Sequence, residues 1–186
     1  MGYAEFLISA VTVGSGGSSS IDFTSIPQTY TDLKVVLSTR DSRTSNGPGY
    51  LKLSINSSTS NFAYKSLYGY SSGPGDPNPS GTPAAGSDGG SGASGNYASY
   101  AGGTNAQTAN SFGNNEIYIP NYTSSNYKSI SVDGVNETNG NYPYQNHLLA
   151  NLWSNTAAIT SLSIIPGSSP FLQYSTATLY GIRAEV

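Results

Sequence analysis

The stretch FTSIPQTYTDLKVVLSTRDS, Phe23 to Ser42, decides the fold of this chain. Its second half alternates between apolar and polar residues, and a period of two over this length predicts a half-buried β-strand. One face would carry Leu33, Val35, Leu37 and Thr39, and the other Lys34, Ser38 and Arg40. Pro27 precedes the strand, and because proline fixes φ and has no N–H donor it fits a corner.

The same period of two recurs along most of the 186 residues, and no segment keeps a period of 3.6. Several short strands separated by turn clusters predict an all-β fold, a jelly-roll-like antiparallel β-sandwich in a single domain over residues 1–186. An immunoglobulin-like topology stays open. The expected strands are Ala4–Val13, Ser19–Phe23, Asp32–Arg40, Tyr50–Asn56, Phe62–Tyr70, Glu116–Ile119, Tyr127–Val135, His147–Ser154, Ile159–Ile165 and Phe171–Ile182.

One long segment, 71–112, interrupts this pattern with about half of the chain's 22 glycines and almost no large aliphatic residue. It predicts a long, irregular Gly/Ser/Pro-rich loop or arm within the domain, because it has too little apolar surface to offset its chain entropy. A flexible linker and an arm ordered against a neighbouring subunit are both open. In the second case its large side chains, Tyr97, Tyr100 and Phe112, are the candidate subunit or shell contacts.

The composition excludes several classes of partner. Charged residues make up 9% of the chain, against about 25% in ordinary domains. The seven basic residues are not clustered, so we expect no nucleic-acid partner, which would need a basic stripe. No apolar run approaches the roughly 20 residues that span a bilayer, so we expect no membrane partner. A surface with few charges suits contact with another protein.

Catalytic chemistry has few candidates in this sequence. Cysteine is absent, which excludes thiolate catalysis and cysteine-based metal sites. His147 is the single histidine, and the carboxylates lie in no recognisable catalytic or calcium-binding motif. We therefore expect a protein that is not an enzyme, with no catalytic residue, no metal and no cofactor.

Tyrosine is frequent, with 15 in the chain, and three of them share one strand parity: Tyr64, Tyr68 and Tyr70. On one sheet face their rings could stack on sugars, which makes them candidates for glycan binding. The alternative is that they belong to the core or to a subunit contact, because tyrosine packs well in strands and interfaces.

Three stretches together resemble a family of virion structural proteins of tailed bacteriophages. They are IDFTSIPQTYTDLKVVLSTRDS (Ile21–Ser42), NEIYIPNYTSSNYKSISVDGV (Asn115–Val135) and LWSNTAAITSLSIIPGSSPFLQYSTATLYGI (Leu152–Ile182). In that family an F-x-x-IP-x-TYTDL segment leads into a strand, a Y-x-P-NY-x-S stretch follows mid-chain, and LW-x-N-TAAI and LYGI segments close the domain. The resemblance covers most of the chain outside 71–112.

This resemblance implies a non-enzymatic, jelly-roll-type structural protein located in the virion and assembled in the host cytoplasm. The expected role is a capsid decoration (cement) protein that binds and stabilises the outer shell. Its partners would be the major capsid protein or another virion protein, together with further copies of itself, as a trimer. The alternative is a tail or fibre module that binds a host-surface glycan or receptor.

Overall fold

The computed structural model describes residues 2–44, 49–71, 96–137 and 144–184, and these form eleven strands. No described helix is long and apolar enough to cross a membrane. The strands are β1 (Tyr3–Thr12), β2 (Ile21–Phe23), β3 (Asp32–Asp41), β4 (Gly49–Ile55), β5 (Phe62–Ser71), β6 (Tyr97–Thr104), β7 (Gly113–Ile119), β8 (Lys128–Asn136), β9 (Tyr144–Trp153), β10 (Leu162–Pro166) and β11 (Thr176–Ala184).

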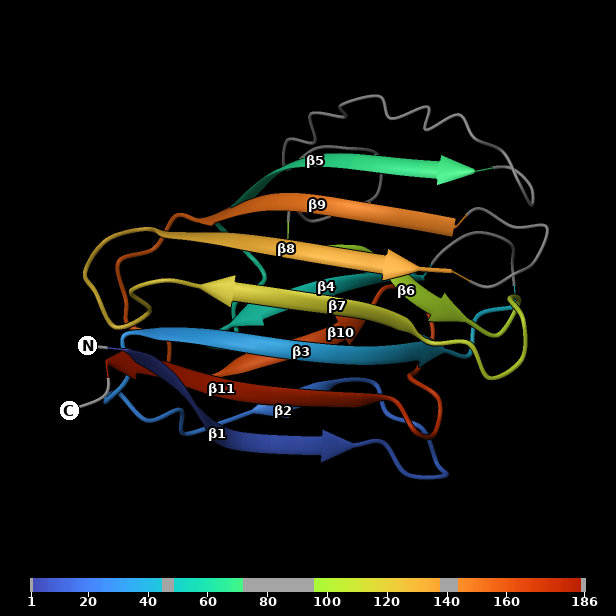
Figure 1. Ribbon diagram of the computed structural model, residues 1–186, viewed down its shortest axis with the longest axis horizontal. Coiled ribbons are helices and arrows are strands. Elements are labelled where there is room, and N and C mark those ends of the chain that lie inside the picture. The colour runs from blue at the N-terminus through green and yellow to red at the C-terminus, as the bar shows by residue number, and fades with distance from the viewer. Residues whose placement is uncertain (1, 45–48, 72–95, 138–143, 185–186) are drawn as a thin grey trace.

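The strands form two antiparallel layers that pack face to face (Figure 1). The large layer has the order β1-β11-β3-β7-β8-β9-β5, and the small layer has the order β2-β10-β4-β6. They join at one corner, where the last residues of β3 pair in parallel with β6. The chain crosses between the layers at every connection except the two that join β7 to β8 and β8 to β9, a pattern typical of jelly rolls. The prediction of an all-β sandwich is confirmed.

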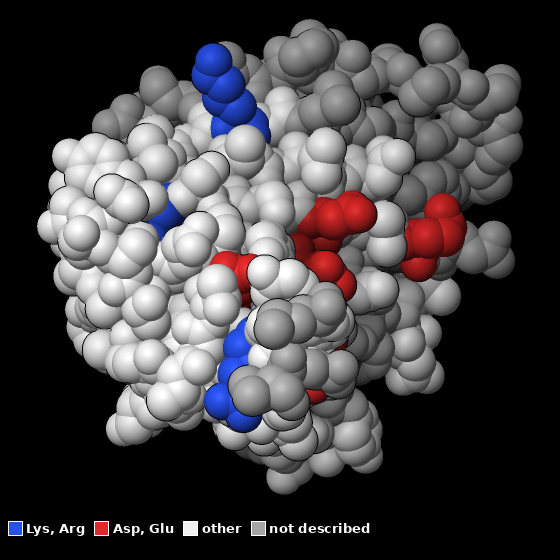
Figure 2. Space-filling view, turned by 60° about the vertical axis from the view of Figure 1, so that its left-hand side comes forward, with Lys and Arg blue, Asp and Glu red and all other residues white. Residues whose placement is uncertain are grey.

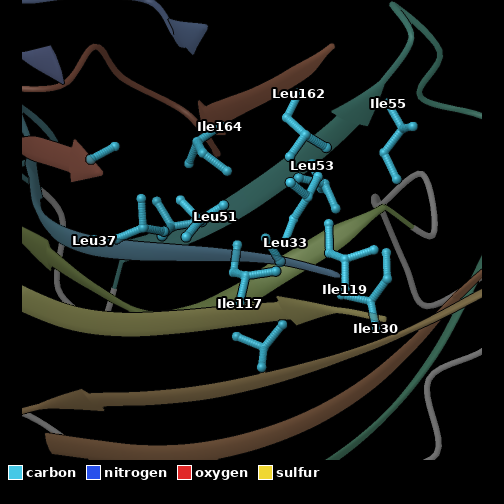
Figure 3. Close-up of a cluster of buried hydrophobic side chains, with 14 of the residues drawn as sticks. Leu33, Leu37, Leu51, Leu53, Ile55, Ile117, Ile119, Ile130, Leu162 and Ile164 are labelled. Atoms are coloured by element: carbon cyan, nitrogen blue, oxygen red, sulfur yellow. The ribbon is translucent and has the colours of Figure 1, made fainter. Parts of the chain in front are cut away.

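The core fills the space between the two layers (Figure 3). Alternation places it there, and β8 is the plainest case, with alternate residues buried along its whole length. Each fully buried leucine or isoleucine contributes about 1.5–3 kcal/mol. The central cluster comprises Leu33, Leu37, Leu51, Leu53, Ile55, Ile117, Ile119, Ile130, Leu162 and Ile164.

The segment 71–112 is not the single irregular arm that the sequence predicts. Residues 72–95 lie outside the described residues, but Tyr97–Thr104 form β6, which pairs with β4 in the small layer and with the end of β3. Part of the expected loop is therefore a strand of the sandwich itself, and the expectation of an arm over the whole segment is wrong.

Glycines at the contacts of β6 with β4 and β3 allow the backbones of these strands to approach closely. The sequence pattern alone does not distinguish such glycines from those of a loop. A Cβ on Gly49 would lie 2.9 Å from the carbonyl oxygen of Gly102 on β6. A Cβ on Gly103 would lie 2.9 Å from the carbonyl oxygen of Thr39 on β3. Only a residue without a side chain fits such contacts, so these glycines mark a strand packed against its neighbours.

The end of β3 also departs from the predicted alternation. Its last three residues are all buried, including Arg40, which the sequence places on the outward face. The segment that follows β6 covers Arg40 and accepts its hydrogen bonds. Nη1 donates to the carbonyl oxygens of Thr108 and Ser111 at 2.8 and 2.7 Å, and Nη2 donates to that of Gln107 at 3.2 Å.

The three stretches that carry the family resemblance meet at one end of the sandwich, the end where β3 begins and both termini lie (Figure 1). Asp32 accepts hydrogen bonds from the Tyr118 hydroxyl at 2.6 Å and from the Asn121 backbone N–H at 2.8 Å. The Tyr122 hydroxyl donates to the carbonyl oxygen of Pro27. The hydrogen bond to Asp32 raises the pKa of Tyr118 to about 12. These contacts join the first stretch to the second.

The third stretch closes the same end through its backbone. The Ile26 N–H donates to the Thr160 carbonyl at 3.0 Å, and the Gln28 side chain donates to the Ile159 carbonyl at 2.9 Å. The Ile159 N–H donates in turn to the Tyr122 carbonyl at 3.0 Å. We call this region the closed end. The corner at Pro27 is therefore a structural joint between two sheets.

Asn56 holds another joint at the closed end, and we expect its loss to destabilise the protein. Its Oδ1 accepts from the backbone N–H of Thr160 and Ser161 at 2.8 and 3.2 Å, and its Nδ2 donates to the Ala158 carbonyl at 2.8 Å. Asn56→Gly suits the positive φ of 51° while removing these bonds. We expect the free energy of unfolding to fall by about 2 kcal/mol in urea denaturation. Asn126→Gly at an exposed turn is the comparison, and an equal loss there would contradict the assignment.

Candidate functional site

Two of the predicted contact residues lie inside the protein. Tyr97 and Tyr64 are 7% and 8% exposed, and their ring centroids are 5.3 Å apart at an interplanar angle of 62°. Tyr97 also packs on Tyr50 at 5.6 Å. Because these rings fill the interior, Tyr97 cannot serve as a shell contact and Tyr64 cannot stack on a sugar. Both expectations are wrong: Tyr64 belongs to the core, the alternative that the sequence left open for it, and Tyr97 packs in the core beside it.

The other candidates are placed only in part. Phe112 is half-buried on the segment between β6 and β7, where it lines a hollow at the end opposite the closed end. The side chains of Tyr68, Tyr70 and Tyr100 lie outside the described residues, although their backbones belong to β5 and β6. Of the candidates whose side chains the structure describes, only Phe112 is partly exposed, while Tyr64 and Tyr97 pack against each other in the core.

We find no assembled catalytic or metal-binding site among the described residues. His147 lies on β9 opposite Gly134 and is 2% exposed, and burial lowers its pKa to about 4, which leaves the imidazole neutral at pH 7. Asp41 is buried at the end of β3, where desolvation raises its pKa. No group of three histidine, aspartate or glutamate side chains that could hold a metal occurs among the residues that the structure describes.

The most extended candidate is the outward face of the large sheet, which no other described strand covers (Figure 1). Strand pairing defines a row across its centre: Thr178, Val36, Glu116, Asp133 and Leu148 lie side by side on β11, β3, β7, β8 and β9. We call the outward residues on and beside this row the open face.

Exposed apolar side chains gather on the open face. Leu148 is 55% exposed and Val135 is 48% exposed, while Val36 and Leu152 are each a little over one-third exposed. Single exposed apolar residues are ordinary, but several on one sheet face form a surface suited to contact with another protein. The motif HLLANLW in β9 could have revealed this surface, because leucines occur on both of its parities and therefore on both faces of the strand.

Two carboxylates lie at the centre of the open face. Glu116 and Asp133 are direct cross-strand partners, an arrangement of like charges that destabilises a sheet. They line a shallow hollow of about 300 Å³ together with Val36, Asn114 and Val135. No described lysine or arginine forms an ion pair with either carboxylate. Figure 2 shows several carboxylates on a surface that is otherwise mostly uncharged.

Comparison with known proteins gives no relative. No family model, curated protein or solved structure matches the chain. The function is therefore inferred from the open face and from the end of the sandwich opposite the closed end.

Proposed function

We propose that this chain is a non-enzymatic structural protein of a tailed-bacteriophage virion, a capsid decoration protein that attaches to the outer shell through its open face. The observation that carries the proposal is the group of exposed apolar side chains around the Glu116–Asp133 pair. The three stretches that resemble phage virion proteins support it, and so does the low charge of the surface. The partner would be the major capsid protein or another virion protein.

The chemistry of the open face defines what the partner should present. A basic side chain of the partner would neutralise the two opposed carboxylates, and an apolar surface around it would cover Val36, Val135 and Leu148. Such a contact relieves the like-charge repulsion that the free protein carries. Because a symmetric shell repeats its binding sites, each protomer would stabilise the shell by mass action.

Asp133→Asn tests this contact through opposite effects on stability and binding. We expect the variant to gain about 0.5 kcal/mol in the free energy of unfolding, because it removes the like-charge pair. Its affinity for shells prepared without the protein should fall about tenfold, which corresponds to about 1.4 kcal/mol. Sedimentation of such shells with added protein measures the bound fraction, and a series of salt concentrations should show a weaker salt dependence for the variant.

A second pair of variants separates apolar contact from charge. Leu148→Ser should reduce attachment without a loss of fold, because its side chain is exposed. Tyr127→Ser is the control, an exposed apolar residue just before β8 at the closed end. Attachment unchanged by both Asp133→Asn and Leu148→Ser would overturn the proposal. Light scattering of the free protein tests the proposed trimer independently.

A further inference from the structure

A second hollow, of about 510 Å³, lies at the end of the sandwich opposite the closed end. Ordinary ligand pockets have volumes of roughly 300–1,000 Å³. Its walls come from four segments: the turn after β1, the end of β3 with the residue that follows it, the segment between β6 and β7, and the connection between β10 and β11. The hollow shares no lining residue with the open face, so a ligand bound in it would serve an activity other than shell attachment.

Hydrogen bonds between these segments hold one wall in place. Ser18 and Phe171 exchange two backbone hydrogen bonds, at 3.1 and 2.7 Å. The Leu172 N–H donates to the Arg40 carbonyl at 2.7 Å, and the Ser42 N–H donates to the Pro170 carbonyl at 2.9 Å. The connection between β10 and β11 is thus tied to the turn after β1 and to the end of β3. A pocket of this kind is formed before any ligand arrives.

Arg40 holds the other wall and is the one charged residue among those that line the hollow. Its guanidinium donates to the three carbonyls of the segment after β6 described above, and the residue is buried. Because these carbonyls already receive its hydrogen bonds, the guanidinium acts as a brace for that segment. Every other residue that lines the hollow is uncharged, and the exposed polar side chains of the lining are neutral.

Tyr174 stands at the rim in a strained conformation. Its φ is +72°, a region that bulky residues rarely adopt, and its side chain is 67% exposed. Hydrogen bonds on both sides impose this geometry: the Tyr174 N–H donates to the Val13 carbonyl at 3.0 Å, and the Val13 N–H donates to the Ser175 carbonyl at 2.8 Å. Such strain costs about 1–3 kcal/mol and concentrates at functional positions. Here it presents an aromatic ring to solvent beside a pocket.

Amide side chains complete the lining. Asn105, Asn110 and Gln173 are exposed around the hollow, and their side chains make no hydrogen bond to other described residues. An amide offers two N–H donors and a carbonyl acceptor, which matches the mixed donor and acceptor character of hydroxyl groups. An exposed ring offers an apolar face on which the C–H face of a sugar can stack.

We propose that this hollow is a binding site for a neutral oligosaccharide, with Tyr174 as the stacking platform and the three amides as hydrogen-bonding partners of the sugar hydroxyls. The site uses none of the tyrosines that the sequence singled out for glycan binding. It also shares no residue with the open face, so the two activities can be tested independently.

The test uses the full-length chain and two changes at Tyr174. Tyr174→Asn removes the ring and suits the positive φ, because asparagine tolerates this conformation better than tyrosine. Tyr174→Phe keeps the ring. Titration calorimetry against a panel of neutral and acidic oligosaccharides should show that the wild-type protein binds a neutral member. The dissociation constant should rise at least tenfold for Tyr174→Asn and less than threefold for Tyr174→Phe.

Stability provides the second readout. Tyr174→Asn should unfold at an equal or higher denaturant concentration than the wild-type protein, because it relieves strain, so its loss of binding cannot come from unfolding. Tyr127→Asn is the matched control at the closed end and should bind normally. Binding is measured in parallel to free oligosaccharides and to an immobilised polysaccharide. The comparison distinguishes a soluble sugar ligand from one that is attached to a surface. The proposal is overturned if no neutral saccharide binds, if only acidic ones bind, or if Tyr174→Asn binds like the wild-type protein.

Discussion

Lys128→Met should lower the free energy of unfolding by about 3 kcal/mol, although methionine keeps most of the length and apolar surface of the side chain. Lys128 is fully buried at the start of β8. Its Nζ donates to the carbonyl oxygens of Ser124, Asn126 and Ala157 at 2.8, 2.6 and 3.1 Å. It also lies 5.9 Å from the centre of the Trp153 ring. One ammonium group therefore ties the turn between β7 and β8 to the segment after β9.

The size of this effect follows from what the variant leaves behind. Burial lowers the pKa of Lys128, so holding the charged form inside has a cost that methionine would remove. The same change leaves three carbonyl oxygens without their charged donor, and each lost bond to a charged group is worth about 1.5–3 kcal/mol. The second effect is the larger. Lys65→Met, at an exposed position on β5, is the control and should change stability by less than 0.5 kcal/mol. A loss at Lys128 no larger than at Lys65, measured by urea denaturation, would refute the role of the ammonium group.

The sequence predicts the strands of the large sheet well because their inward residues alternate with polar ones. The quoted strand at Asp32–Arg40, for example, lies at the centre of the sandwich and pairs with β7 and β11. The prediction fails for Tyr97–Thr104, because glycine signals a turn and a close backbone contact equally well. It fails for Arg40 because the cover over that residue comes from a segment about 70 positions further along the chain. Both failures involve contacts between segments that are far apart in the sequence, which a local pattern of residues does not contain.

The candidate sites were harder to predict than the fold. The quoted stretches with Pro27, Asp32 and Tyr122 hydrogen-bond to one another, so the most recognisable motifs build the closed end. The hollow at the opposite end depends instead on Tyr174, whose positive φ is set by hydrogen bonds to Val13 and by no residue preference of its own. Strong sequence motifs therefore identify the scaffold here, while the positions suited to binding follow from tertiary contacts.

A fall in pH should destabilise this protein through His147, by about 3 kcal/mol between pH 6.5 and pH 4. The ordinary pKa of histidine is 6.5, and burial lowers that of His147 to about 4. Below pH 6.5 the unfolded chain therefore binds a proton that the folded chain does not, so the stability present above this pH is lost as the pH falls toward 4. A difference of about 2.5 pKa units at about 1.4 kcal/mol each gives the size of the effect.

His147→Gln isolates this contribution, because glutamine is polar, of similar size and does not titrate. Carboxylates titrate in the same range in both proteins, and Asp41, with its raised pKa, acts in the opposite direction by stabilising the folded state as the pH falls. The informative quantity is therefore the difference between the two profiles of unfolding free energy against pH. We expect the unfolding free energy of the wild-type protein minus that of the variant to fall by about 3 kcal/mol from pH 7 to pH 4, whatever the stability of the variant at neutral pH. Parallel profiles would mean that His147 becomes protonated in the folded protein as readily as in the unfolded chain, and that its burial does not govern its charge.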